Sequence, residues 1–265
     1  MKDFILFPPE YGRVRLEDRD IPVKDCYHLS TKGKDALWLT EMQNNYLCDM
    51  DWFLESCCTS VEEVLEAQAR GAGRIELCER LDVGGVTPSD ELLAEVLAVT
   101  ELPVNVLVRP RGGDFIFSED EVSQMLESIT ACRERNVNGV VIGALDSDGG
   151  VDIPTMKRLL EAAKGPSEED FPPLSVTFHR AFDVCSGPLR ALDEIISLGC
   201  DRLLTSGHEA DAFRGRFLIA ELVRRAEGRI TVMAGCGVRP GNIDEIRSTT
   251  GAPEYHASSS FFRQQ

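Results

Sequence analysis

Residues 53–78, FLESCCTSVEEVLEAQARGAGRIELC, predict a strand, a helix and a second strand in succession. Both ends of this stretch are short runs rich in apolar side chains, which is typical of buried strands. Between them, Ser60 and Glu63 fit a capping box, in which a hydroxyl and a carboxylate satisfy the unpaired amides of a helix start. Gly71 follows the helical run and suits the left-handed cap that ends many helices.

This alternation continues through the rest of the chain. Ser118 and Glu121 fit a second capping box, and Gly199 and Gly251 stand where further helices should end. The predicted strands are Phe53–Cys58, Arg74–Cys78, Val104–Val108, Gly139–Gly143, Leu174–Phe178, Arg202–Thr205, Ile230–Ala234 and Glu254–Ala257. Eight apolar strands that alternate with helices favour an α/β fold, a (β/α)8 TIM barrel, over an open sheet. Because the chain ends at Gln265, just after the eighth strand, we expect the eighth outer helix to be missing.

Residues 1–50 differ from the remainder because no stretch within them keeps a regular period for long. We therefore predict two parts, an amino-terminal extension over residues 1–50 and the barrel over residues 51–265. The pattern leaves open whether the extension is only partly ordered or packs on the barrel.

Composition and charge limit the class of protein. With 265 residues, 43% of them hydrophobic, the chain can bury a substantial core. No apolar run approaches the roughly 20 residues of a membrane span. A formal net charge of −17 argues against non-specific nucleic-acid binding, so neither nucleic acid nor membrane is an expected partner. A few arginines can still make one cleft positive, which keeps a small anionic metabolite among the possible ligands.

Cysteine usage and the amino terminus predict a cytoplasmic protein. The apolar run Phe4–Phe7 is too short for a secretory signal and leads directly into two prolines. Nine cysteines, an odd number without disulfide-like spacing, indicate free thiols in a reducing compartment.

Chemistry in such a barrel sits at the carboxyl ends of the strands. Because side chains alternate along a strand, Glu55 and Cys57 share one face, and Glu76 and Cys78 repeat this arrangement on the next strand. The later strands deliver further polar groups to the same rim: Arg109 and Arg111, His179 and Asp183, Gly235 and Gly237, and His256 with Ser258. Burying so many ionisable groups costs several kcal/mol unless they pair or serve a site.

These groups allow an enzymatic interpretation. Burial can bring the pKa of a carboxyl group or an imidazole near neutrality, which makes four groups candidates for acid–base chemistry: Glu55, Glu76, His179 and Asp183. Two features are candidates for anion binding. Arg109 and Arg111 can each bind a carboxylate or phosphate through two hydrogen bonds, and Gly235 and Gly237 form a glycine-rich turn before a helix start, where a phosphate can bind. For the carboxylates, the alternative is a mutually neutralised ion network in which Glu55 and Glu76 balance Arg109 and Arg111. For His179 it is a core histidine paired with a carboxylate such as Glu76 or Asp183, and for the glycines it is an ordinary strand–helix turn.

The cysteines allow a metal-binding interpretation. Cys57 and Cys78 end neighbouring strands on the inward face, so their sulfur atoms can approach one ion. Soft metal ions prefer sulfur ligands such as thiolates. The chain has no C-x-x-C motif, and the alternative is that both cysteines are small buried hydrophobic residues.

Six motifs run through the barrel in a fixed order: FLESC (53–57), RIELC (74–78), GGVTP (84–88), RPRGGDF (109–115), VTFHRAFD (176–183) and LTSG (204–207). Together they resemble the copper homeostasis protein CutC family. The resemblance implies a cytosolic TIM barrel that is often oligomeric and takes part in copper handling, with Cu(I) bound at Cys57 and Cys78. The chain departs from the family in residues 1–50, in how soon it ends after the eighth strand and at Cys236, where the family often has glycine.

The leading prediction is therefore a cytoplasmic copper homeostasis protein of CutC type, a homo-oligomer that binds Cu(I) through Cys57 and Cys78. The alternative is a TIM-barrel lyase or isomerase that acts on a small phosphate- or carboxylate-bearing metabolite at the same strand ends. Whether the protein is an enzyme stays open at this point.

Overall fold

The computed structural model describes residues 13–16, 19–22, 52–165 and 172–263. By its contacts the chain divides into residues 1–50 and residues 51–265. In the first part, strands β1 (Arg13–Leu16) and β2 (Arg19–Pro22) pair in antiparallel fashion. The rest of residues 1–51 lies outside the described residues, and so does the choice between the two arrangements predicted for the extension.

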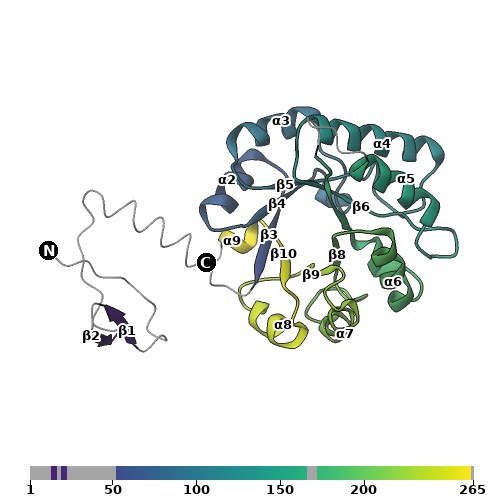
Figure 1. The fold of residues 1–265 in the computed structure, drawn as a ribbon. Coiled ribbons are helices and arrows are strands. Elements are labelled where there is room, and N and C mark those ends of the chain that lie inside the picture. Colours follow the sequence, from purple (N-terminus) through teal and green to yellow (C-terminus); the bar gives the residue numbers. More distant parts are fainter. Residues whose placement is uncertain (1–12, 17–18, 23–51, 166–171, 264–265) are drawn as a thin grey trace. The chain divides into compact units, whose positions relative to one another are not determined.

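The second part is a closed barrel of eight parallel strands in the order β10–β3–β4–β5–β6–β7–β8–β9 (Figure 1). The strands are β3 (Phe53–Cys58), β4 (Arg74–Leu77), β5 (Val104–Leu107), β6 (Gly139–Ile142), β7 (Ser175–Phe178), β8 (Arg202–Thr205), β9 (Thr231–Gly235) and β10 (Glu254–Ser258). The barrel closes where Tyr255 of β10 pairs with Leu54 of β3. The predicted TIM barrel is confirmed, and every predicted strand limit agrees with the structure to within one residue.

Helices surround the barrel and connect successive strands (Figure 1). They are α2 (Val61–Ala69), α3 (Asp90–Val99), α4 (Glu119–Glu134), α5 (Ile153–Lys164), α6 (Pro188–Leu198), α7 (Arg216–Ala226) and α8 (Ile243–Thr250). Ser118 and Glu121 form the predicted capping box of α4. At α2 the Ser60 hydroxyl caps Glu63 N as predicted, whereas the Glu63 carboxylate accepts from Thr59 N. None of the described helices is both long and apolar enough to cross a membrane.

After β10 the described chain continues with α9 (Ser260–Arg263), a single helical turn. Phe261 and Phe262 in this turn are buried. Just before it, Ser259 N donates to the carbonyl oxygen of Cys57 at 3.2 Å, and Ser259 Oγ donates to Glu63 at 2.8 Å. These contacts tie the segment that follows β10 to β3 and α2.

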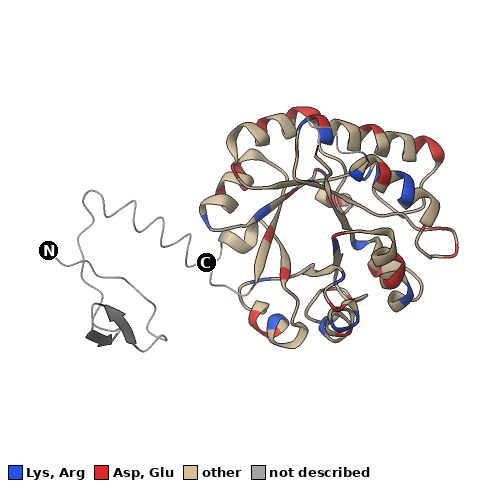
Figure 2. Ribbon diagram, in the orientation of Figure 1, with Lys and Arg blue, Asp and Glu red and all other residues tan. Residues whose placement is uncertain are grey.

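The barrel has an apolar layer between its strands and helices and a polar interior within the ring of strands. Apolar side chains fill the space between strands and helices, as the alternation along each strand requires. Inside the ring, the strands bury polar and charged side chains, among them Glu55, Arg74, Glu76 and Asn105. Figure 2 shows charged residues on the inner strands as well as on the outer helices. The candidate site is built from this polar interior.

Candidate functional site

The two cysteines predicted to bind a metal lie side by side. Parallel pairing places Cys57 of β3 beside Glu76 of β4, and Cys78 follows two residues later, where alternation returns it to the inner face. The two sulfur atoms are 3.6 Å apart, both side chains are buried and both cysteines are free. The hydrogen bond to Cys78 and burial raise the pKa of the Cys57 thiol well above its usual value. The structure thus brings two soft donors within reach of one ion.

Glu76 lies next to this thiol pair and is only 6% exposed. Its Oε2 has no hydrogen-bond partner among the described residues, and the Nδ1 of His256 lies 3.9 Å from it. Burial raises the pKa of Glu76 to about 7, and the nearby Glu55 charge adds to the rise against the opposing charges of His256 and Arg74. A carboxyl group with a pKa near neutrality therefore borders the sulfur atoms.

Glu55 lies two residues earlier on β3, within a fully paired ion cluster. Its carboxylate accepts a hydrogen bond from Arg74 Nε at 2.5 Å and is 2.8 Å from His256 Nδ1. Burial alone would raise the pKa of Glu55, but the hydrogen bond with His256 and the charge of Arg74 lower it to about 2. Glu55 is therefore ionised and held by Arg74 and His256, rather than by the Arg109 and Arg111 of the predicted ion network.

His256 belongs to the site, although the sequence analysis placed it at the rim without giving it a role. Barrel closure pairs it with Glu55 across a separation of 201 residues. Burial would lower the pKa of His256, but the charge of Glu76 and the hydrogen bond with Glu55 raise it. Alternation along β10 indicates that the side chain points inward, whereas its partner becomes visible only in the closed barrel.

His179, at the end of β7, is buried without a carboxylate partner among the described residues. Its Nδ1 accepts a hydrogen bond from Ala181 N at 3.2 Å, so the proton of the neutral ring lies on Nε2. That Nε2 has no partner among the described residues. Burial and the charge of Arg109 lower the pKa of His179 to about 3, and the ring is neutral at physiological pH. In this state His179 is a hydrogen-bond donor rather than a base.

Asp183 lies in the short 3-10 helix η4 (Arg180–Val184) that follows β7. Its carboxylate accepts from Thr205 Oγ1 at 2.5 Å and from Ser206 N at 2.9 Å, at the end of β8. Arg180 Nε donates to the same carboxylate at 2.8 Å. These contacts make Asp183 the residue that joins the loops after two neighbouring strands.

The two predicted anion-binding arginines do not converge. Arg109 is buried, and its guanidinium donates to four main-chain carbonyl groups, those of Val83, Gly84, Gly85 and Gly113. Its Nε has no partner among the described residues. Arg111 instead pairs with Glu121 at 2.5 Å and with Asp114 at 3.0 Å. Arg109 therefore faces the interior, while Arg111 holds the loop after β5 against the start of α4.

The predicted glycine cradle is a tightly packed turn after β9. A side-chain carbon at Gly235 would lie 2.4 Å from Leu204 Cδ1 and 3.1 Å from His256 Cβ, so a larger residue would require these side chains to shift. Gly237 has φ +68°, and a side-chain carbon on it would meet Asp211 at 2.9 Å. Cys236 between them also has a positive φ, +73°, although it is not glycine. Packing and backbone conformation thus account for both glycines.

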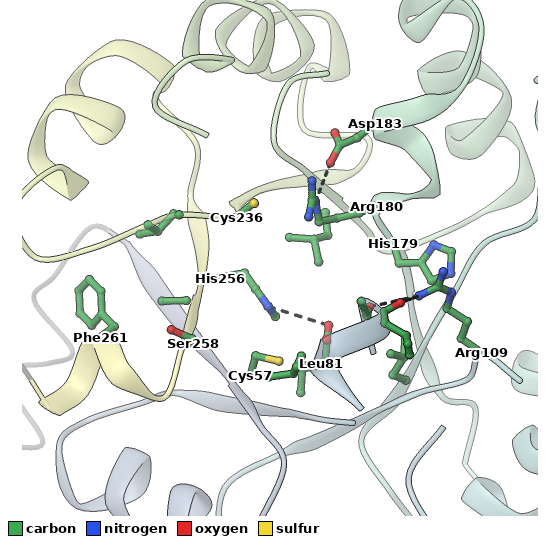
Figure 3. A pocket seen from close by; sticks show the side chains of 18 of the residues that line it. Cys57, Leu81, Arg109, His179, Arg180, Asp183, Cys236, His256, Ser258 and Phe261 are labelled. Atoms are coloured by element: carbon green, nitrogen blue, oxygen red, sulfur yellow. Dashed lines mark hydrogen bonds and ion pairs between the residues drawn. The ribbon is translucent and has the colours of Figure 1, made fainter. Parts of the chain in front are cut away.

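A cavity of about 590 Å³ opens at the carboxyl ends of the strands (Figure 3). Six of the predicted site residues line it: Cys57, Glu76, Arg109, His179, Asp183 and Gly237. The remaining predicted residues are not among its lining: Glu55, Cys78, Arg111 and Gly235. The sequence analysis assigned no role to three basic residues that do line it: Arg180, Arg239 and His256.

Two overlapping groups of side chains in this region have metal-ligand spacing. Cys57, Glu76 and Cys78 place their ligand atoms within 4.8 Å of one another, and so do Glu55, Glu76 and His256. In the second group the Glu55 carboxylate is already neutralised, because it accepts a hydrogen bond from Arg74 and is hydrogen-bonded to His256. The first group contains the reduced thiols and is the better candidate for a soft metal ion.

A closed eight-stranded parallel barrel with a cavity and a thiol pair at its carboxyl ends defines a TIM-barrel protein. The sequence model of the CutC family matches residues 52–261, and the chain belongs to this family. The predicted family is thereby confirmed.

Individual relatives agree with this assignment. The family protein CutC of Parabacteroides distasonis is 51% identical over 211 residues, which are 79% of this chain and 84% of the relative. The corresponding protein of Bacteroides fragilis is 50% identical over 212 residues, which are 79% of this chain and 80% of the relative. A crystal structure from Streptococcus agalactiae, described provisionally as the copper homeostasis protein CutC, has a TM-score of 0.72 at 30% identity. It covers 78% of this chain and 98% of its own.

Proposed function

We propose that this protein is a cytoplasmic copper homeostasis protein that binds Cu(I) through Cys57 and Cys78. The observation that carries the proposal is the 3.6 Å separation of two free, buried sulfur atoms at the carboxyl end of the barrel. Thiolates are the ligands that Cu(I) prefers, and two or three of them suffice. The provisional description of the Streptococcus agalactiae relative as a copper homeostasis protein supports the same role.

The surroundings of the thiol pair fit a bound cation. Binding replaces the two thiol protons with one Cu(I), which leaves a net negative charge on the cluster. His256, with its raised pKa, and Arg74 supply positive charge within the same interior. Cys57 lines the cavity, so the ion has a path from solvent to the sulfur atoms.

Support for the alternative, a lyase or isomerase of a small anionic metabolite, is weaker. The guanidinium of Arg109 already donates to main-chain carbonyl groups, and Arg111 is paired with Glu121 outside the cavity lining. The neutral His179 donor and the near-neutral Glu76 keep a ligand at this mouth chemically reasonable. The predicted homo-oligomer concerns a second copy of the chain and stays a prediction.

Anaerobic competition titration against a chromophoric Cu(I) chelator tests the proposed function. The variant Cys57→Ser/Cys78→Ser should bind Cu(I) more weakly by over 100-fold, because it removes both ligands and not merely a supporting residue, whose loss typically costs about 10- to 100-fold. The matched control is Cys132→Ser/Cys200→Ser, which replaces two other buried cysteines and should keep the wild-type affinity. Unchanged stoichiometry and affinity in the first variant would overturn the proposal.

A further inference from the structure

The thiol pair has a third potential ligand that Cu(I) does not require. We propose that Cys57, Cys78 and Glu76 also form a site for a divalent cation, Zn²⁺, in which these three residues are the ligands and the fourth position opens to the cavity. The inference rests on the same thiol pair as the proposed function and adds the metal selectivity of the site.

The spacing of the sulfur atoms suits a tetrahedral ion. Two zinc–sulfur bonds of about 2.3 Å at the tetrahedral angle separate the sulfur atoms by about 3.8 Å. The observed separation between Cys57 and Cys78 is 3.6 Å. The carboxylate oxygen of Glu76 lies within 4.8 Å of both sulfur atoms, so a small closing movement completes three corners of the tetrahedron.

The free oxygen of Glu76 is the second observation that points to a ligand. Its Oε2 is buried and has no hydrogen-bond partner among the described residues. A buried carboxylate oxygen without a partner is unfavourable unless something binds it. Oxygen is a normal ligand for Zn²⁺ together with thiolate sulfur, whereas Cu(I) selects the sulfur atoms. A mixed set of two sulfurs and one oxygen therefore distinguishes the two metals.

The position of the set within the barrel leaves room for a further ligand. Cys57 and Glu76 both line the cavity of about 590 Å³. Zinc sites with three protein ligands and one open position are typical of sites that bind water or a small molecule. His256 lies 3.9 Å from Glu76 and is anchored by Glu55, so the carboxylate has a neighbour that orients it.

Titration of the reduced apoprotein with Zn²⁺, in competition with a chromophoric chelator, tests the inference. Wild-type protein should bind one Zn²⁺, and Glu76→Gln should weaken that binding by about 10- to 100-fold or more. In the Cu(I) titration the same variant should change the affinity by less than about threefold, because both thiolates remain. Glu62→Gln, at an exposed position on α2, is the matched control and should leave both affinities unchanged.

Co²⁺ gives a readout that does not depend on affinity. Bound in place of Zn²⁺, it should show the visible bands of a tetrahedral ion and the near-ultraviolet bands of thiolate ligands. The visible bands should change in Glu76→Gln, and the thiolate bands should vanish in Cys57→Ser/Cys78→Ser. Thermal unfolding of each variant establishes that it is folded.

The outcomes separate the two proposals. Equal Zn²⁺ affinity in wild type and Glu76→Gln, or no Zn²⁺ binding by wild type, would overturn this inference while leaving the Cu(I) result untouched. Loss of Zn²⁺ binding with full Cu(I) binding in Cys57→Ser/Cys78→Ser would instead overturn the proposed function and support the zinc site.

Discussion

The two ends of the barrel interior differ in how their polar groups are satisfied. Toward the amino ends of the strands, Arg74 donates to Glu55 and to Glu254, and Arg202 donates to Glu254 as well. Toward the carboxyl ends, four buried atoms have no hydrogen-bond partner among the described residues: Glu76 Oε2, Arg109 Nε, Thr177 Oγ1 and His179 Nε2. One end is a closed ion network, and the other keeps free donors and acceptors.

Strained backbone conformations are also found at the carboxyl ends of the strands. Among the described residues, five that are not glycine have a positive φ, and three of them follow a strand at its carboxyl end: Arg80, His208 and Cys236. Such conformations cost about 1–3 kcal/mol each, and they persist only where the surroundings enforce them.

The polar groups at the two ends of the barrel therefore have different roles. Paired charges at the amino ends stabilise the closed barrel, because each buried ion meets an opposite charge. Unpaired groups and strained turns at the carboxyl ends lower stability and leave atoms free to bind a ligand, as expected for the functional end of a TIM barrel. The predictions below test this division from the largest expected effect to the smallest.

Arg74→Met should produce the largest loss of stability. The substitution leaves Glu55 and Glu254 buried near each other without their shared cation, and breaking a buried ion pair in this way costs about 3–5 kcal/mol. Urea unfolding at pH 7 measures the change. Arg158→Met, which removes an exposed pair with Glu119, is the control and should cost less than about 1 kcal/mol. Equal losses in both variants would contradict the proposed division.

Glu55→Gln should destabilise the protein in a pH-dependent way. The pKa of Glu55 is lowered from 4.5 to about 2, so its ionised form stabilises the fold by about 3 kcal/mol above pH 5. This contribution is lost as the pH falls through the folded pKa. The difference between wild type and variant in urea unfolding should therefore be largest at pH 7 and shrink steadily from pH 5 toward pH 3. A difference that is independent of pH would argue against the ion pair as its cause.

Glu76→Gln should stabilise the protein at high pH, which is the opposite of the effect expected for Glu55→Gln. The pKa of Glu76 is raised from 4.5 to about 7, so the stability of wild type is fully present below pH 4.5 and is lost as the pH rises through 7. The amide of the variant does not ionise, so the variant does not lose this stability. The metal-free variant should match wild type near pH 4 and exceed it by up to about 3 kcal/mol at pH 8. Equal stability of the two proteins at pH 8 would show that ionised Glu76 is satisfied.

Much of this architecture could be predicted from sequence, because strand periodicity is a local signal. Alternation in residues 53–58 and 74–78 places Cys57 and Cys78 on the inner faces of adjacent strands, and their sulfur atoms are indeed in contact.

The remaining features depend on closure and on loop geometry, which carry no periodic signal. The pairing of His256 with Glu55 joins residues 201 positions apart and exists only once β10 meets β3. Arg111 shares the alternation of Arg109, yet the loop after β5 turns it toward Glu121, away from the cavity. Residue type and spacing therefore predicted which groups reach the rim, but not which of them are already paired there.

Cys236→Gly tests the strained turn after β9, at the carboxyl end of the barrel, and should have the smallest effect on stability. Cys236 has φ +73°, a left-handed conformation that costs a non-glycine residue about 1–2 kcal/mol. Glycine adopts it freely but loses more conformational entropy on folding, so a net gain of about 1 kcal/mol is expected in urea unfolding. Cys236→Ala is the matched variant, because it removes the Sγ contact with the Ala210 carbonyl at 3.3 Å and keeps the strain. If alanine stabilises as much as glycine, the side chain and not the backbone is the source of the effect; a gain restricted to glycine places the strain in the turn that borders the cavity.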